Sequence, residues 1–164
     1  MPGIEAYLDI ETTGLSSYYS QVTVIGIYRV NGNDCEFTQL VGKDITCDHL
    51  LEALRDVNTI FTYNGSRFDL PFIYDALGIN LCDHFNHRDL MFDCWRNNLK
   101  GGLKAVERRL GIDRELTGVD GYQAVVLWCR YRDHGDEQAL DTLLRYNRED
   151  VVNLHTLRQT LGVA

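Results

Sequence analysis

Two carboxylates lie one residue apart near the start of the chain, in the run DIETTG at residues 9–14. Asp9 and Glu11 interrupt a segment, residues 4–12, in which apolar residues alternate as they do in a strand. On a strand, a spacing of two places both carboxylates on one face, about 6–7 Å apart. Such a pair of oxygen donors suits Mg²⁺ or Mn²⁺, although the solvent-facing side of an amphipathic edge strand would carry the same residues.

A third acid, Asp69, lies in NGSRFDLPF at residues 64–72. The β-rich run before it predicts a strand that ends in an Asn-Gly turn. The residues after it predict a helix that has Pro71 in its first turn and stops at Gly78. An aspartate at this position is a good helix N-cap. The carboxyl end of a strand is also where α/β proteins place ligand-binding groups, so Asp69 has two interpretations.

The last predicted helix, residues 136–161, carries a fourth acid inside its apolar face. Its leucines and valines form one arc at about 100° per residue, and Asp150 projects within that arc. Asn147 lies beside it and Tyr146 one turn back. A carboxylate that faces a core costs several kcal/mol unless a cation or good hydrogen bonds compensate it. An ion pair with an arginine or a bound metal would each satisfy Asp150.

The rest of the pattern predicts the elements that must position these acids. No repeat, low-complexity tract or linker interrupts the chain, and 45% hydrophobic residues with only two prolines indicate one ordered domain. A turn at Asn31-Gly32-Asn33 predicts a hairpin. Strands are predicted at residues 4–12, 22–30, 35–41, 59–65 and 88–93. Helices are predicted at residues 48–57, 69–78, 103–111, 121–133 and 136–161. Three strands followed by alternating strands and helices predict a mixed sheet with helices on its faces.

The formal net charge of −8 has the wrong sign for a protein that holds nucleic acid by phosphate neutralisation alone. Residues 95–114 differ, because six Lys or Arg face two acids there, a local net charge of +4. This segment either binds a polyanion locally or is an ordinary solvated helix face. The five cysteines form no CxxC pair, and no signal peptide or long apolar run is present, so we expect a cytoplasmic protein without membrane contact.

In order along the chain, DIETTG, NGSRFDLPF and YNRED resemble the three exonuclease motifs of the DEDD (DnaQ-like) superfamily. The third resembles the Tyr-x-x-x-Asp variant of that superfamily, from Tyr146 to Asp150. The other subgroup has His five residues before the final Asp, where this chain has Arg145. GGLKAVERRLGI and YNREDVVNL also resemble local patterns of the YprB-type ribonuclease-H-like domain, and this resemblance covers nearly the whole chain.

The resemblance implies an α/β ribonuclease-H-like fold, a mixed five-stranded sheet flanked by helices, in a single domain over residues 1–164. It further implies a hydrolase, a 3′–5′ exonuclease that acts on single-stranded 3′ ends of DNA or RNA and releases nucleoside 5′-monophosphates. Two alternatives keep the same acids: a structure-selective endonuclease, and a nucleic-acid-binding module whose acids only hold a structural metal. The choice between DNA and RNA and the oligomeric state stay open.

In that scheme, four acids hold two Mg²⁺ or Mn²⁺ ions about 4 Å apart, and Tyr146 orients the attacking water. A phenol with an ordinary pKa of about 10 is a poor general base at neutral pH, so positioning is the expected role. The expected metal ligands are Asp9, Glu11, Asp69 and Asp150. The expected substrate contacts are Thr12, Asn64, Lys100, Lys104 and Arg108, of which Lys104 and Arg108 share one helix face.

Several other polar residues have weaker signals. Glu107 lies on the apolar arc of its helix and is expected in an ion pair at the edge of the core, or as a support of the site. Asp89 and Asp93, near the predicted fifth strand, are expected to cap a helix or close a turn, with support of the site as the alternative. The group Cys82, His84 and His87 has metal-ligand residue types but lacks a second pair at zinc-finger spacing. Tyr18 and Tyr19 could stack on a base.

Overall fold

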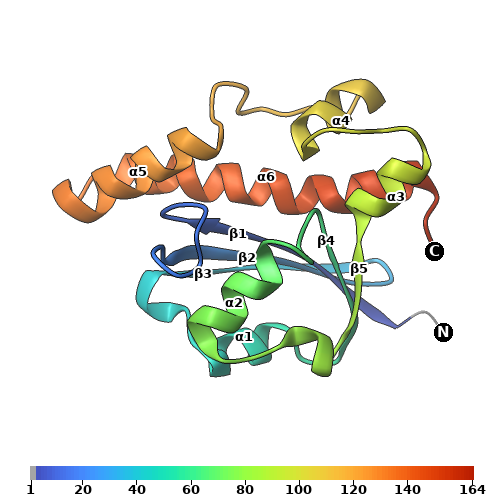
Figure 1. The fold of residues 1–164 in the computed structure, drawn as a ribbon, viewed down its shortest axis with the longest axis horizontal. Helices are drawn as coiled ribbons and strands as arrows, with labels where there is room; N and C mark the ends of the chain where they lie inside the picture. Colours follow the sequence, from blue (N-terminus) through green and yellow to red (C-terminus); the bar gives the residue numbers. More distant parts are fainter. Residues whose placement is uncertain (1–2) are drawn as a thin grey trace.

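The computed structural model describes residues 3–164, which are built around a mixed five-stranded sheet of order β3-β2-β1-β4-β5 (Figure 1). β1 and β2, and β2 and β3, pair antiparallel, whereas β4 runs parallel to both β1 and β5. The strands are β1 (Ile4–Thr12), β2 (Val22–Asn31), β3 (Asp34–Val41), β4 (Val57–Thr62) and β5 (Asn86–Asp89). The hairpin expected between β2 and β3 is confirmed, with Gly32 at a φ of 60° in its two-residue loop.

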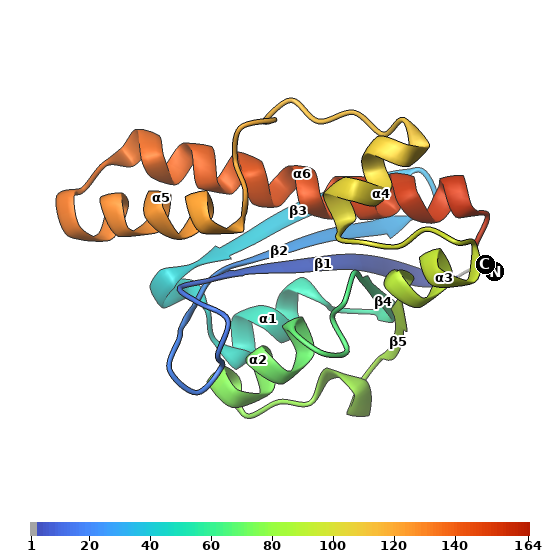
Figure 2. The same ribbon diagram turned by 45° about the horizontal axis from the view of Figure 1, so that its top comes forward.

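Helices cover both faces of this sheet (Figures 1 and 2). α1 and α2 lie on one face, and the long α6 crosses the other, with α5 alongside it and α3 and α4 near its C-terminal half. The helices are α1 (Cys47–Ala53), α2 (Asp69–Leu77), α3 (Leu90–Arg96), α4 (Leu103–Leu110), α5 (Gly121–His134) and α6 (Glu137–Leu161), with short 3₁₀ helices at Gly42–Asp44 and Leu81–Asp83. The expected single α/β domain with a five-stranded mixed sheet is confirmed.

β1 is the central strand, and both of its faces are buried. Ala6, Leu8 and Ile10 pack into the core under α1 and α2, while Tyr7 belongs to the core under α6. Because side chains alternate along β1, Asp9 and Glu11 lie on the same face as Tyr7, beneath α6. The interpretation of the acid pair as the solvent-facing side of an edge strand is wrong for this reason.

Two predicted elements differ in the structure. The helix predicted at residues 48–57 ends at Ala53, because Val57 is buried and pairs with β1 at the start of β4. The strand predicted at residues 88–93 ends at Asp89, whose side chain accepts the Met91 N–H at 3.1 Å and caps α3. This N-cap stabilises the start of a helix in the residues that follow. The capping role expected of Asp89 is confirmed.

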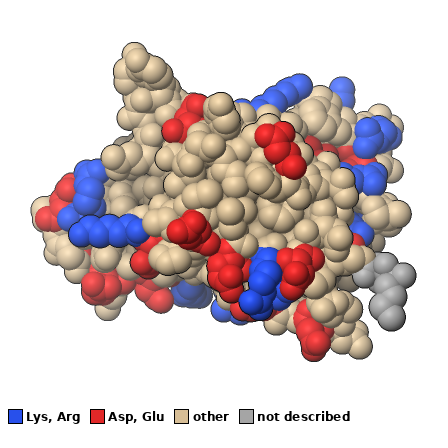
Figure 3. All heavy atoms as spheres, turned by 90° about the horizontal axis from the view of Figure 1, so that it is seen from below, with Lys and Arg blue, Asp and Glu red and all other residues tan. Residues whose placement is uncertain are grey.

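The outer surface agrees with the acidic net charge. Acidic and basic side chains are interspersed on the face that is seen from below in Figure 3, without a broad basic patch. Between residues 3 and 164, no helix combines the length and the apolar character that a membrane crossing requires.

Candidate active site

Three carboxylates from two elements meet between the central strand and α6. Asp9 and Glu11 come from β1 and Asp150 from α6, and one oxygen of each lies within 4.8 Å of the others. Glu11 is 8% exposed and Asp150 only 6%. The alternation of β1 places Asp9 and Glu11 on one face, and the periodicity of α6 places Asp150 on its buried side. The packing of α6 across β1 brings the three together.

The contact between α6 and the sheet is set by Asn147, which is fully buried. Its Nδ2 donates to the backbone oxygen of Asp9 at 3.2 Å and to Oδ2 of Asp9 at 3.3 Å, while its Oδ1 accepts from Gln39 Nε2 at 2.9 Å. The helix comes close because β2 has Gly26 here, where a Cβ would clash with Asn147 and lie 2.9 Å from Val151 Cγ2. Asn147 thus fixes the register of α6 on β1, a role that the sequence analysis missed.

Asp69 lies beside the three-acid cluster but is tied to the backbone of β1. β4 pairs with β1 only as far as Tyr7, so the N–H of Ile10 is left without a partner strand. Asp69, buried at the start of α2, accepts that N–H through Oδ2 at 3.1 Å. The alternative role as the N-cap of α2 is wrong, since Phe68 occupies that position without a side-chain hydrogen bond.

The buried acids repel one another. Burial, followed by the charges of neighbouring carboxylates, raises the pKa of Asp9 and of Glu11 well above the usual range, and the charge of Lys104 partly offsets this. Burial raises the pKa of Asp69 to about 7 against the opposing hydrogen bond from Ile10. Burial also raises the pKa of Asp150. Clustered carboxylate oxygens that resist ionisation are a donor set that fits Mg²⁺ or Mn²⁺, since a cation compensates their charge.

These shifts predict that the metal-free protein loses stability as pH rises. The unfolded chain releases the Asp69 proton near pH 4 and the folded chain near pH 7, so the stabilisation is complete below pH 4 and falls away up to pH 7. Between pH 5 and 7, this one group lowers the free energy of unfolding by about 2–3 kcal/mol, or the melting temperature by at least about 5 °C. Scanning calorimetry in EDTA at pH 5, 6 and 7 measures the effect.

Asp69→Asn is the matched variant for this experiment, since it should flatten the pH dependence. Excess Mg²⁺ should raise the melting temperature most at pH 7, because the cation binds the ionised acids. A melting temperature that stays constant or rises from pH 5 to 7 would contradict the burial of four mutually repelling carboxylates.

Asp150 also accepts a hydrogen bond from an arginine. Nη2 of Arg114 contacts its Oδ1, and Nη1 of Arg114 donates to both oxygens of Glu107 at 2.8 and 3.0 Å. The arginine ion pair that the sequence left open for Asp150 is therefore present, and the clustered acids are a donor set for the other alternative, a bound metal. The ion pair expected of Glu107 is confirmed, but Arg114 was not identified from the sequence, where only its basic segment stood out.

Tyr146 lies one helical turn before Asp150 and is buried against two cations. Nζ of Lys104 donates to its hydroxyl and lies 4.5 Å from the ring centroid, and the guanidinium carbon of Arg114 lies 5.5 Å from the same centroid. Burial and the charges of the acid cluster raise the pKa of the phenol, which stays protonated at neutral pH. Because its oxygen accepts from Lys104, the hydroxyl proton is free to be donated elsewhere.

A cleft of about 610 Å³ opens onto Asp9, Glu11, Asp150 and Tyr146. Thr12 lines it, with its hydroxyl donating to the Gly14 backbone oxygen at 2.6 Å. Two exposed apolar side chains also line it, Leu15 from the loop after β1 and Tyr122 from the start of α5. Neither was singled out from the sequence, and Tyr18 and Tyr19 are exposed in the same loop without lining the cleft.

The other expected substrate residues lie outside this cleft. Asn64 occupies the turn before α2 with a φ of 60°, and its N–H donates to Asp89 at 2.8 Å. Lys100 precedes α4 and Arg108 lies on it, both exposed. Lys104 reaches the site through its contact with Tyr146 and, with Arg108, lines a neighbouring cavity of about 490 Å³. Of these residues, Lys104 is the one placed next to the acids.

The remaining polar signals have structural partners. Asp93 pairs with Arg88 at 2.8 Å and with Arg96 at 2.6 Å, so it links β5 and α3 rather than capping a helix. Cys82 and His84 are exposed, whereas Nε2 of the neighbouring His87 is hydrogen-bonded to the Thr62 hydroxyl at 2.8 Å. These contacts account for Asp93 and His87.

A family model described as the RNase_H superfamily matches residues 6–162. The chain belongs to this superfamily. It is 27% identical over 168 residues to the uncharacterized protein YprB of Bacillus subtilis (strain 168), a match that covers 92% of this chain and 40% of YprB. The chain therefore spans about two-fifths of the length of this curated relative.

Two solved structures support the same fold. Brucella melitensis NrnC superposes with a TM-score of 0.62 at 20% identity, covering 96% of this chain and 71% of NrnC. E. coli exonuclease I, in complex with a dA16 oligonucleotide, superposes with a TM-score of 0.50 at 15% identity, covering 93% of this chain and 46% of the other. The expected ribonuclease-H-like fold is confirmed, with exonuclease I among its structural neighbours.

Proposed function

We propose that the chain is a metal-dependent 3′–5′ exonuclease of the Tyr-containing DEDD type that hydrolyses single-stranded nucleic acid to nucleoside 5′-monophosphates. The observation that carries the proposal is the cluster of Asp9, Glu11 and Asp150, whose oxygens lie within 4.8 Å of one another at a cleft. The neighbours lend support, since structures of Brucella melitensis NrnC hold Mg²⁺ or pGG and exonuclease I holds dA16.

Asp9, Glu11 and Asp150, joined by Asp69, would hold two divalent cations. When bound, the cations activate the attacking water and stabilise the leaving 3′-oxygen and the charge on the phosphoryl group. The protonated hydroxyl of Tyr146 donates to that water and orients it, while Lys104 holds the hydroxyl in place. Asn147 keeps α6, which carries Asp150, in register with β1, and Arg114 links Asp150 to Glu107 of α4.

The apolar side chains at the cleft favour a single strand with unpaired bases. Leu15 is 90% exposed and Tyr122 is 74% exposed where they line the cleft. The aromatic ring of Tyr122 can stack on a base without sequence preference, and Leu15 adds an apolar contact. We further propose that Thr12 and Asn64 contact the terminal nucleotide and that Lys100, Lys104 and Arg108 contact backbone phosphates. Of these, Lys104 lies next to the acids and Arg108 lines the neighbouring cavity with it, on a chain that is otherwise acidic.

End-labelled DNA and RNA oligonucleotides of the same sequence test the proposal. We expect a ladder that shortens from the 3′ end, requires Mg²⁺ or Mn²⁺ and stops with EDTA. A 3′-terminal block should slow degradation far more than a 5′-terminal block. Equal sensitivity to both blocks would contradict the exonuclease assignment; internal cuts would indicate an endonuclease, and a mobility shift without cleavage would indicate a binding module.

A further inference from the structure

A buried row of three charges ends at the proposed metal site. Glu107 of α4 is fully buried, the Arg114 side chain is 9% exposed, and Asp150 follows on α6. The guanidinium binds Glu107 with Nη1 through both carboxylate oxygens and contacts only Oδ1 of Asp150 with Nη2. The planar donors of arginine suit this double contact, which a lysine would not reproduce.

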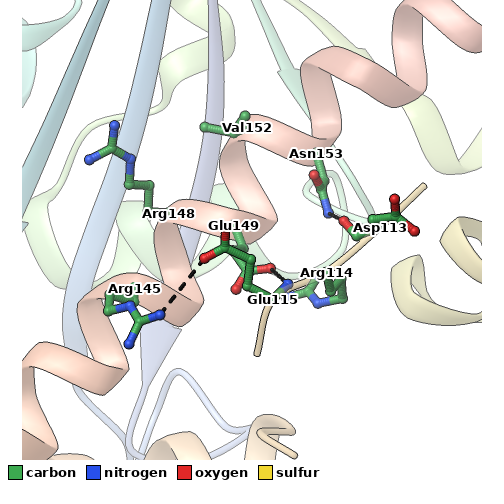
Figure 4. Close-up of a pocket in the computed structure, with 8 residues that line it drawn as sticks. All are labelled: Asp113, Arg114, Glu115, Arg145, Arg148, Glu149, Val152 and Asn153. Atoms are coloured by element: carbon green, nitrogen blue, oxygen red, sulfur yellow. Dashed lines mark hydrogen bonds and ion pairs between the residues drawn. The ribbon is translucent and has the colours of Figure 1, made fainter. Parts of the chain in front are cut away.

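The backbone around Arg114 is anchored to α6, the helix that carries Asp150 and Tyr146. Glu149 accepts the two backbone N–H groups of residues 115–116 at 2.8 and 2.9 Å. Asn153 donates to the backbone oxygen of Asp113 at 3.3 Å, and Figure 4 shows this segment lying alongside the helix. Residues three and four apart on a helix are neighbours. Glu149 and Asn153, which bind the segment, therefore lie close to Asp150 on α6, and the helix fixes the position of the segment relative to the proposed ligand.

Asn153 also fixes the far end of the charge row. Its Nδ2 donates to Oε2 of Glu107 at 2.5 Å, in addition to the backbone contact. Glu107 therefore accepts three hydrogen bonds, two from Arg114 and one from Asn153, and the bond from Asn153 anchors it to α6 independently of the guanidinium. The row is held at Glu107 and at residues 113–116, and its free end is the carboxylate of Asp150.

The charges of Glu107 and Arg114 allow this pair to support Asp150 as a ligand of a cation. Glu107 balances the charge of Arg114, so the pair presents a hydrogen-bond donor to Asp150 with little net repulsion toward a cation. A ligating carboxylate is oriented by hydrogen bonds from outside the metal's coordination sphere, and these raise affinity by holding the ligand in place. With Oδ1 engaged by Arg114, the other oxygen of Asp150 stays available to the cluster.

We propose that Arg114 is a positioning residue for Asp150 and that Glu107 is the counter-charge which makes this possible beside a metal. The inference rests on the proposed function, because it assumes that Asp150 binds a divalent cation. In a competing role, Arg114 would occupy the place of the metal cation. Removal of such a competitor would strengthen metal binding, whereas removal of a support weakens it.

Calorimetric titration with Mn²⁺ alone distinguishes these roles without any measurement of cleavage. Arg114→Met should weaken Mn²⁺ binding by about 10–100-fold, and Arg114→Lys should recover part of the loss. Glu107→Gln keeps the shape and the contact with Asn153, and should also weaken binding, because the unbalanced charge of Arg114 then repels the cation. Arg145→Met is the matched control: it removes an exposed arginine of α6, 3.8 Å from Glu115, and should bind as the unmodified protein does.

Unchanged or tighter Mn²⁺ binding in Arg114→Met, with normal binding by the unmodified protein, would overturn this inference alone. Absence of Mn²⁺ binding in the unmodified protein would overturn the proposed function and the inference with it. If Arg114→Met does not fold, as judged by far-ultraviolet circular dichroism, Arg114→Lys and Glu107→Gln decide: lower melting temperatures with unchanged Mn²⁺ affinity in both would reduce the row to a structural ion pair.

Discussion

Asp150→Asn is expected to lower single-turnover cleavage by at least about 10³-fold. The change keeps the shape of the side chain and its contact with Arg114 but removes one charge from the cluster of Asp9 and Glu11. A bound cation supplies several kcal/mol of transition-state stabilisation, and about 1.4 kcal/mol corresponds to a tenfold change in rate. Mn²⁺ affinity, measured by calorimetry, should fall in parallel.

Folding should survive this change. Burial raises the pKa of Asp150 even with Arg114 and Lys104 nearby, so the substitution removes a charge that burial disfavours and that repels the other acids of the cluster. We expect a melting temperature in EDTA that is equal to or higher than that of the unmodified protein. Asp141→Asn is the matched control, because Asp141 is an exposed aspartate of the same helix and should affect neither property. Near-normal turnover in Asp150→Asn would make Asp150 only the ion-pair partner of Arg114.

Tyr146→Phe is expected to separate turnover from metal binding. The change keeps the buried ring and its contacts with Lys104 and Arg114 but deletes the hydroxyl, which is the group proposed to orient the water. Turnover should fall by roughly 10²–10⁴-fold, the range for loss of a proton-handling or positioning group. Mn²⁺ affinity should stay within about twofold, because Tyr146 is not among the proposed ligands. Single-turnover cleavage and calorimetry on the same preparation measure both.

The pH dependence of cleavage supplies a further check on the role of Tyr146. Burial and the acid cluster keep the phenol protonated at neutral pH. The pH profiles of cleavage for the unmodified protein and for Tyr146→Phe should therefore have the same shape and differ only in the rate. Tyr74→Phe, in an exposed tyrosine of α2, is the control and should leave turnover unchanged. A loss of Mn²⁺ binding in Tyr146→Phe would instead assign Tyr146 to the structural support of the cluster.

Local patterns were sufficient to locate most elements of the site. The alternation of β1 placed Asp9 and Glu11 on one face, and the apolar arc of α6 placed Asp150 on its buried side, because side-chain direction follows backbone periodicity. Patterns failed where a single polar contact ended an element. Asp89 caps α3 and turned an expected strand into a helix, a contact that periodicity does not encode.

The sequence by itself determined the chemistry that the chain can offer: four acids, a tyrosine one turn before the last of them, and the strand and helix faces that carry them. Only the tertiary structure decided which side chains meet. The bond from Asp69 to the Ile10 N–H follows from where β4 stops pairing with β1. Arg114 reaches Asp150 across 36 residues because a long side chain in an irregular segment has no periodicity to reveal its direction.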